Sequence, residues 1–353
     1  MPSGQDGETR MDGAREGDAR SELASGLAKA CSRHFGRPVR IAGLFRHSGG
    51  ASRQTWGFDA IFGDGAVEKL VLRRDPPRAA DAPPQNFENS LAIDRATEFA
   101  VMRAAGQHGV PAPSMLFIAR PDDGVGDGYV MKSVDGTAIA RELLRAPRFE
   151  HARQRIPGQL GAILAKLHAV PLSALPRLNI GGAESVIATM RRALDTTREP
   201  HPVFELALTW LERRMPPMPA TPSFVHGDFR TGNYLADESG VTAILDWEIA
   251  HLGDPLEDLG WLCVKSWRFG AVDKPAGGFG SREELWDAYE AAGGAKINRD
   301  HARWWEILGT ARWGVICMTQ AWKHLSGAEE SMELASIGRR AVETEVDLLE
   351  LLG

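Results

Sequence analysis

The stretch FVHGDFRTGNYLADESGVTAILDWEIAHLGDPLEDL, residues 224–259, places polar residues between short apolar runs. The triplet His226-Gly227-Asp228 directly follows the apolar pair Phe224-Val225, and Asn233 comes a few residues later. This order predicts a strand that ends in a loop carrying one carboxylate and one carboxamide.

A hairpin is expected immediately after this loop. The turn-forming run 237–240 separates a short strand beginning at Tyr234 from a second strand over residues 241–245. Asp246 ends the second strand, so the hairpin should return it to the neighbourhood of Asp228 and Asn233.

These residue types suit phosphoryl transfer. Asn233 and Asp246 offer hard oxygen ligands, and Mg²⁺ prefers one or two of these together with nucleotide phosphates. Asp228 is then free to accept a hydroxyl proton, with Arg230 as the cation near the transferred group. Together they make the layout of a kinase-type site.

With these residues in place, the chain resembles the aminoglycoside phosphotransferase (APH) family, which has a protein-kinase-like fold. Its His-Gly-Asp loop replaces the His-Arg-Asp of protein kinases, and Asp246-Trp247-Glu248 replaces Asp-Phe-Gly. The runs HGDFRTGN, ILDWEIAHLGDPLEDL and RWGVICMTQAWKHLSG are similar to kinase-like domains fused to acyl-CoA dehydrogenases. The resemblance covers roughly residues 25–353, and the ordered polar positions make it specific.

The resemblance implies an α+β, bilobal protein-kinase-like fold with a small β-rich N-lobe and a larger, mainly helical C-lobe. Residues 1–22 are expected to form a disordered arm, because this segment mixes charges with glycine. The N-lobe is expected over 23–131, a hinge over 132–136, and the helical C-lobe over 137–353.

Nucleotide contacts in the N-lobe are also implied. Ser48, Gly49 and Gly50 lie between two predicted strands, where glycine lets backbone N–H groups approach phosphate. An ordinary hairpin loop is the alternative. By resemblance Arg73 occupies the place of the kinase strand lysine and Glu98 is its ion-pair partner, with Lys69 as a rival on the same strand face.

The predicted hinge follows a strand that includes Met131. By resemblance the backbone of Lys132 and Val134 hydrogen-bonds adenine, while Met131 lines the adenine pocket or belongs to the core.

Supporting roles are expected on both sides of the catalytic loop. His226 should brace the loop by hydrogen bonding, and Asp258 should anchor it from the next helix. Asp254 either caps that helix or contacts the loop. His168 ends a predicted core helix and is expected to be structural.

The amino-acid composition limits the classes of partner that the protein is expected to bind. A net charge of −6 gives no basic footprint for nucleic acid, and no apolar run approaches the roughly 20 residues that span a bilayer. Three widely spaced cysteines in apolar contexts indicate reduced core positions and a cytoplasmic location. Oligomeric state is not set by the sequence.

The expected function is therefore ATP- and Mg²⁺-dependent phosphorylation of a hydroxyl group on a small molecule. The acyl-CoA dehydrogenase branch favours a hydroxy acid or hydroxyacyl-CoA, for which Lys265, Arg268 and Arg312 are candidate phosphate contacts. An aminoglycoside or amino-alcohol kinase and a nucleotide-binding pseudokinase are alternatives. A metal-dependent hydrolase using His226, Asp228, Asp246 and His251 is a weaker one.

Overall fold

A computed structural model describes residues 5–47, 53–75, 91–197 and 199–353, with the side chains of residues 5–16 excepted. The chain divides into two compact units. Unit 1 comprises Met1–Glu88, Ile93–Arg103 and Pro113–Val134, and unit 2 comprises Asn89–Ala92, Ala104–Ala112 and Asp135–Gly353. The chain passes from one unit to the other after Val134, within the expected hinge, whose hinging role stays a prediction.

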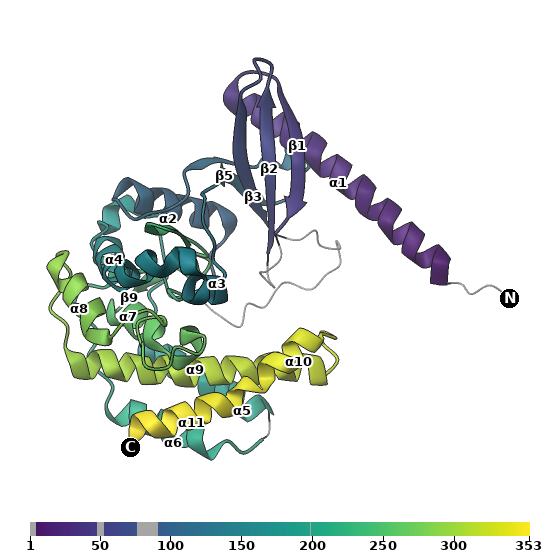
Figure 1. The fold of residues 1–353 in the computed structure, drawn as a ribbon. Helices are drawn as coiled ribbons and strands as arrows, with labels where there is room; N and C mark the ends of the chain where they lie inside the picture. The colour runs from purple at the N-terminus through teal and green to yellow at the C-terminus, as the bar shows by residue number, and fades with distance from the viewer. Residues whose placement is uncertain (1–4, 48–52, 76–90, 198) are drawn as a thin grey trace. The chain divides into compact units, whose positions relative to one another are not determined.

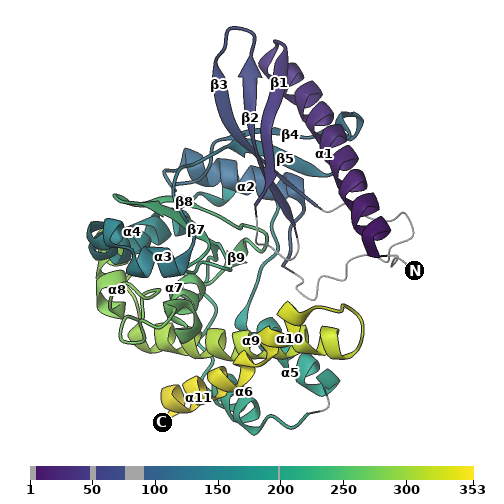
Figure 2. The same ribbon diagram turned by 45° about the vertical axis from the view of Figure 1, so that its right-hand side comes forward.

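Unit 1 is built on one antiparallel five-stranded sheet in the order β1-β2-β3-β5-β4 (Figure 2). Successive side chains of each strand point to opposite faces of the sheet, and on one face Phe58, Leu70, Leu72 and Val130 pack into a common core. The strands are β1 (Val39–Arg46), β2 (Gln54–Phe62), β3 (Val67–Arg74), β4 (Met115–Ile118) and β5 (Gly128–Lys132).

The first helix, α1 (Gln5–Phe35), packs against β1 and buries Leu23, Leu27 and Cys31 in the core of the sheet. Its N-terminal half extends beyond the sheet (Figure 1). The prediction of a disordered arm over residues 1–22 therefore differs from the structure, in which α1 begins at Gln5. Residues 5–22 contain three Arg and three Glu, which are good helix formers, and they lack proline, so the helix can continue through them despite three glycines.

Helix α2 (Arg95–Gln107) begins where the Asp94 carboxylate accepts a hydrogen bond from the Thr97 amide at 2.7 Å. Its first part belongs to unit 1 and its last turn to unit 2. A short 3₁₀ helix, η1 (Pro121–Asp123), precedes β5.

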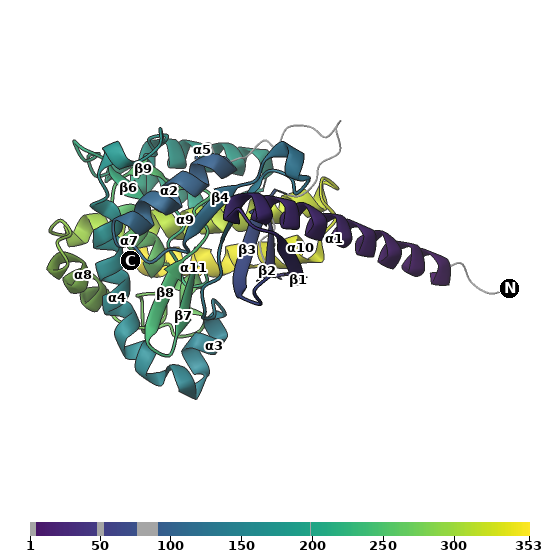
Figure 3. The ribbon, with the colours of Figure 1, turned by 90° about the horizontal axis from the view of Figure 1, so that it is seen from above.

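Unit 2 is mainly helical and is organised around the long helix α9 (Arg299–Leu325). Helices α5, α6, α7, α10 and α11 contact it, and α11 runs beside it (Figure 3). The helices are α3 (Ala140–Arg145), α4 (Glu150–His168), α5 (Ala183–Thr197), α6 (Pro202–Arg213), α7 (Leu256–Cys263), α8 (Arg282–Ala291), α10 (Met332–Gly338) and α11 (Arg340–Leu352). The 3₁₀ segments are η2 (Pro147–Phe149), η3 (Leu172–Ala174) and η4 (Lys265–Arg268).

Two of the helical predictions need correction. Apolar residues at helical spacing predict one continuous buried face over residues 304–325, and this face is buried from Trp304 to Met318, but Trp322 and Leu325 are 38% and 71% exposed. The sequence also predicts a single final helix over roughly residues 331–352, which the structure divides into α10 and α11 at Arg339. Gly338, just before the break, approaches α9 so closely that a Cβ there would lie 2.3 Å from the Cβ of Ala321.

Two small antiparallel ribbons carry the polar stretch of the sequence. Strand β6 (Ser223–Val225) pairs with β9 (His251–Gly253), and β7 (Tyr234–Asp237) pairs with β8 (Gly240–Ile244). The predicted hairpin and the predicted α+β architecture, a small sheet unit and a larger helical unit, are both confirmed. No helix in the described part of the chain is long and apolar enough to cross a membrane.

Candidate active site

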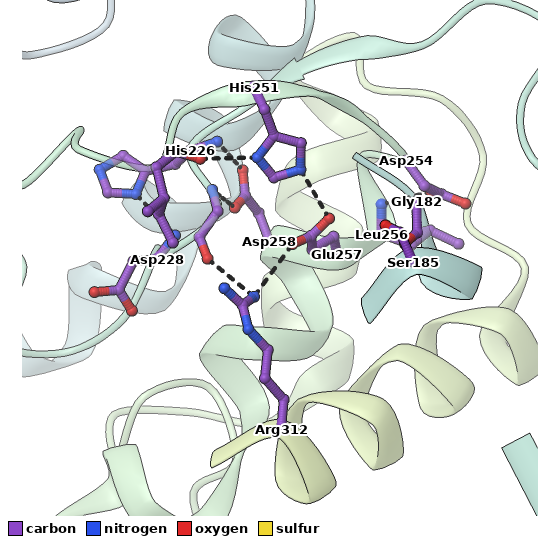
Figure 4. Close-up of polar contacts among 12 residues, drawn as sticks. Gly182, Ser185, His226, Asp228, His251, Asp254, Leu256, Glu257, Asp258 and Arg312 are labelled. Atoms are coloured by element: carbon purple, nitrogen blue, oxygen red, sulfur yellow. Dashed lines mark hydrogen bonds and ion pairs between the residues drawn. The ribbon is translucent and has the colours of Figure 1, made fainter. Parts of the chain in front are cut away.

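The loop between β6 and β7 is held from below by Asp258 of α7 (Figure 4). Its carboxylate accepts the backbone N–H of His226 at 2.8 Å and that of Gly227 at 2.9 Å. The expected anchoring contact is therefore present, because both amides of the turn end on one buried carboxylate. Figure 4 also shows the Asp228 carboxylate pointing away from Asp258.

Asp258 belongs to a chain of hydrogen bonds that reaches two other helices. His168 at the end of α4 bonds through Nε2 to Asp258 at 3.1 Å, and through Nδ1 to the Tyr289 hydroxyl of α8 at 3.1 Å. Burial raises the pKa of Asp258, but the His168 hydrogen bond and the charges of His168 and His226 outweigh it, so the pKa is lowered overall. The carboxylate is thus stabilised as an anion, and His168 has the structural role expected of it.

His226 links the loop to the hairpin. Its Nδ1 accepts the Asp228 N–H at 3.2 Å, so Nε2 carries the proton and donates to the Leu245 carbonyl at 2.9 Å. The expected bracing contact is present. It ties the residue before Asp246 to the loop that carries Asp228.

Donors from three positions fix the Asp228 carboxylate. Trp261 Nε1 lies 2.7 Å and Arg230 Nε 3.1 Å from Oδ1, while Asn233 Nδ2 lies 2.6 Å from Oδ2. Arg230 also places its guanidinium 4.6 Å from the ring centroid of Trp267. In this structure the expected catalytic cation is therefore paired with the expected base.

The residues expected to hold Mg²⁺ fit that role chemically. A carboxylate can only accept, so the Asn233 amide must turn its Nδ2 towards Asp228, which directs its Oδ1 away as an oxygen ligand. The Leu245 N–H donates to the Asn233 carbonyl at 2.8 Å, which brings Asp246 next to the loop. Asp246 adopts φ 63°, a left-handed conformation in which strain often marks functional residues.

A second buried network lies on the other side of the loop. His251 bonds through Nδ1 to the Ile249 carbonyl at 2.8 Å and through Nε2 to Glu257 at 3.2 Å. Arg312 Nη1 lies 3.4 Å from Glu257 Oε1 and 3.5 Å from the Gly227 carbonyl (Figure 4). Gly227 has no room for a side chain in this network. A Cβ there would lie 2.7 Å from the Ile249 carbonyl oxygen and 3.2 Å from the His251 ring.

The hydrolase alternative finds no support in this arrangement. His251 is buried with both ring nitrogens engaged, and within the described ranges no cluster of three or more His, Cys, Asp or Glu residues could hold a metal ion. Asp254 accepts the Leu256 N–H at the start of α7 at 2.9 Å, which supports the capping interpretation.

In unit 1 the expected pair of Arg73 and Glu98 is present, with 3.3 Å between Arg73 Nε and Glu98 Oε1. Glu98 is fully buried and also pairs with Arg53 at 3.2 Å and with Arg95. Asp75 lies 3.7 Å from Arg53 and 3.4 Å from Arg95. Among the residues that the structure describes, three guanidinium groups thus gather around Glu98 and Asp75, and guanidinium groups are well suited to bind nucleotide phosphate.

The structure bears on some of the other residues predicted to contact nucleotide in the N-lobe and not on others. Lys69 is exposed on β3, which favours Arg73 of the two rivals. Met131 is 7% exposed on β5, and Lys132 already donates its N–H to the Ser114 carbonyl at 2.9 Å, so only its carbonyl could serve adenine. Val134 is the last residue of unit 1. Ser48, Gly49 and Gly50 lie outside the described residues.

Several residues that contact the candidate site residues were not predicted from the sequence. Trp261 follows Asp258 by three positions, so both face the loop from one side of α7, a helical spacing that could have identified it. Arg53 and Arg95 share Glu98 with Arg73, but no local pattern joins a strand, a helix and their neighbouring loops in advance.

The cations expected to contact a CoA-type acceptor form ion pairs with carboxylates of the protein itself. Lys265 pairs with Asp347 at 2.8 Å and with Glu350 at 2.9 Å. Arg268 is 8% exposed and bonds to Glu306 and to backbone carbonyls, and Arg312 pairs with Glu257. A role of these three residues in binding acceptor phosphate stays a prediction, and in this structure each of them is paired with a carboxylate.

Comparisons with known proteins agree with this geometry. A sequence model described as "Phosphotransferase enzyme family" matches residues 46–294. The chain is 30% identical over 210 residues to "Acyl-CoA dehydrogenase family member 10" of Mus musculus, an alignment covering 56% of this chain and 18% of that protein. The chain thus spans less than a fifth of that relative.

Solved structures resemble the fold closely. A protein from Ralstonia eutropha, provisionally described as an aminoglycoside phosphotransferase, has a TM-score of 0.71 and 22% identity, with 92% of this chain and 97% of that one covered. A spectinomycin phosphotransferase in complex with ADP and spectinomycin has a TM-score of 0.61 and 12% identity, with coverage of 91% and 96%.

Proposed function

Because the chain belongs to the phosphotransferase enzyme (APH) family, we propose that it transfers the γ-phosphoryl group of ATP to a hydroxyl group of a small molecule. The observation that carries the proposal is the arrangement of Asp228, Asn233 and Asp246 on one loop and the adjoining hairpin end. A degenerate pseudokinase would have no need to preserve this set. The complex of a structural neighbour with ADP supports an adenine nucleotide as the donor.

In the proposed reaction Asp228 accepts the proton of the acceptor hydroxyl. The acceptor oxygen forms a bond to the γ-phosphorus, the bond from that phosphorus to the β,γ-bridging oxygen breaks, and ADP leaves. Arg230 offsets charge on the transferring group. Asn233 and Asp246 would hold Mg²⁺, which would neutralise phosphate charge.

Nucleotide contacts are assigned to unit 1 as part of the same proposal. Arg73, supported by Glu98, would reach the phosphates, with the backbone of Ser48, Gly49 and Gly50 beside them. The carbonyl of Lys132 and the backbone of Val134 would bind adenine next to Met131. The gathering of the Arg53, Arg73 and Arg95 guanidinium groups around Glu98 supports this assignment.

For the acceptor, we propose a hydroxy acid or hydroxyacyl-CoA, on the similarity to an acyl-CoA dehydrogenase relative. An aminoglycoside or amino alcohol is the second candidate, because structural neighbours act on antibiotics such as spectinomycin. The internal pairing of Lys265, Arg268 and Arg312 favours an acceptor without the CoA phosphates, so the free hydroxy acid comes first within its class.

The test is a panel of hydroxy acids, hydroxyacyl-CoAs, aminoglycosides and amino alcohols, offered with Mg²⁺ and γ-labelled ATP. Transfer to one class is expected, and Asp228→Ala should lower kcat by at least about a hundredfold while ATP affinity stays near that of the wild type. Asp237→Ala, at the end of β7 next to the hairpin turn, is the control. Wild-type turnover by Asp228→Ala would remove Asp228 from the chemistry.

A further inference from the structure

The hydrogen bonds of Asp228 leave one of its oxygens better placed for proton transfer than the other. A carboxylate offers about four acceptor positions on its two oxygens. Oδ1 receives Trp261 Nε1 and Arg230 Nε, whereas Oδ2 receives only Asn233 Nδ2. Within the described part of the chain, the remaining acceptor position is therefore on Oδ2.

We propose that Trp261 is a positioning residue for phosphoryl transfer, whose indole N–H holds Oδ1 so that Oδ2 faces the acceptor hydroxyl. This proposal rests on the proposed function, in which Asp228 accepts the hydroxyl proton. Trp261 touches neither substrate nor nucleotide in this scheme. It acts by selecting which oxygen of Asp228 is presented.

Arg230 has a second task in the proposed reaction besides its contact with Oδ1. Its guanidinium is the cation proposed to offset charge on the transferring phosphoryl group, and a shift towards that group would lengthen its 3.1 Å contact with Asp228. The indole of Trp261 is a neutral donor at 2.7 Å and has no competing partner of this kind. When Arg230 turns to the phosphoryl group, Trp261 is left as the donor that fixes Oδ1.

The surroundings of Trp261 are suited to this task. The side chain is 4% exposed, with the Arg312 guanidinium 5.0 Å from its ring centroid and Trp267 at 5.3 Å. Asp258, three positions earlier in α7, holds the backbone of the same loop. One turn of a helix thus fixes both the backbone of the loop and the carboxylate that it carries.

Trp261→Phe removes the N–H and keeps an aromatic ring. The matched control is Trp313→Phe, because Trp313 packs on Trp267 in the same aromatic cluster and its buried Nε1 has no hydrogen-bond partner among the residues described. We expect Trp261→Phe to lower kcat of Mg-ATP turnover about ten- to a hundredfold, with KM for ATP within about twofold of wild type. Trp313→Phe should keep the wild-type kcat, and equal kcat values for the two variants would overturn the proposal.

A spectroscopic readout tests the contact without an acceptor. In ¹⁵N-tryptophan-labelled protein, the indole resonance missing from Trp261→Phe should lie downfield, because its proton bonds to a carboxylate. In Asp228→Ala it should move upfield while the Trp313 resonance stays in place. An unmoved Trp261 resonance would show that the hydrogen bond is absent in solution and would end the proposal.

The two proposals fail differently. If Asp228→Ala retains turnover, the proposed function falls and the positioning role falls with it. If Asp228→Ala is inactive while Trp261→Phe turns over like Trp313→Phe, only the positioning role of Trp261 is lost.

Discussion

Asp258 shows how one buried side chain can set the conformation of an active-site loop. It accepts two backbone amides and a histidine, so Asp258→Asn would present an N–H₂ group to at least one of these donors. We expect a loss of about 3–5 kcal/mol in the free energy of unfolding, measured by urea denaturation, because a buried charged acceptor is removed. Asp254→Asn should cost less than about 1 kcal/mol, since the hydrogen bond from the Leu256 amide survives on Oδ1. A similar loss for both variants would contradict this account.

His251 predicts a pH dependence of stability. Burial lowers the pKa of His251. The charge and hydrogen bond of Glu257, the Ile249 carbonyl and the charge of Asp258 together raise it by more than burial lowers it, so the folded-state pKa exceeds the ordinary value of 6.5. The protonated form is therefore favoured by folding. Its stabilisation is fully present below pH 6.5 and is lost as the pH rises through the raised pKa.

The corresponding variant is His251→Gln. The difference in unfolding free energy between wild type and His251→Gln should be largest below pH 6.5 and should shrink at higher pH. Arg312 faces Glu257 from α9 and remains in both proteins. A difference that is constant from pH 5 to pH 9 would mean that folding does not shift the pKa of His251.

At the scale of elements, close helix packing transmits structure to the site. Gly161 of α4 meets α8 so closely that a Cβ would lie 2.4 Å from the Leu285 carbonyl oxygen and 2.9 Å from the Tyr289 nitrogen. Gly161→Ala should destabilise the protein by about 2–4 kcal/mol. Because Tyr289 and His168 carry the hydrogen bonds that reach Asp258, kcat should fall as well.

Gly158 supplies the matched control on the same helix. A Cβ there would have no neighbour within 4 Å, so Gly158→Ala should raise stability by about 0.5–1 kcal/mol through helix propensity. Thermal denaturation of both variants tests the prediction. Destabilisation by Gly158→Ala, or tolerance of Gly161→Ala, would show that α4 and α8 pack differently in solution.

Elements that depend on neighbours in sequence could be predicted, whereas features that depend on contacts between distant segments could not. Alternating and helical patterns predicted the hairpin after Tyr234 and the buried face of α9 as far as Met318, because each depends on neighbours in sequence. The break at Arg339 could not be predicted, since it follows from the approach of Gly338 to Ala321 of α9. Likewise, the arginines sharing Glu98 come from separate segments that only the fold unites.

For the whole molecule, the sequence indicated a small sheet unit and a larger helical unit, and the candidate catalytic residues fall in the second. Asp228, Asn233 and Asp246 are joined through the backbone of Leu245 within unit 2, so their geometry does not depend on the placement of unit 1. A nucleotide that binds the folded chain and not the unfolded chain should stabilise the folded state.

Mg-ATP should raise the unfolding temperature through this linkage. A ligand at a hundred times its Kd adds about 2.7 kcal/mol to the stability of the folded state, which corresponds to a shift of several degrees. Asp246→Asn tests the metal contribution, because asparagine tolerates the left-handed conformation at φ 63° but lacks the charge. We expect this variant to lose most of the Mg²⁺-dependent shift, measured as the difference between ATP with Mg²⁺ and ATP with EDTA. Asp237→Asn, at the end of β7 next to the hairpin turn, should keep the full difference. If Asp246→Asn keeps it as well, Asp246 does not hold the metal.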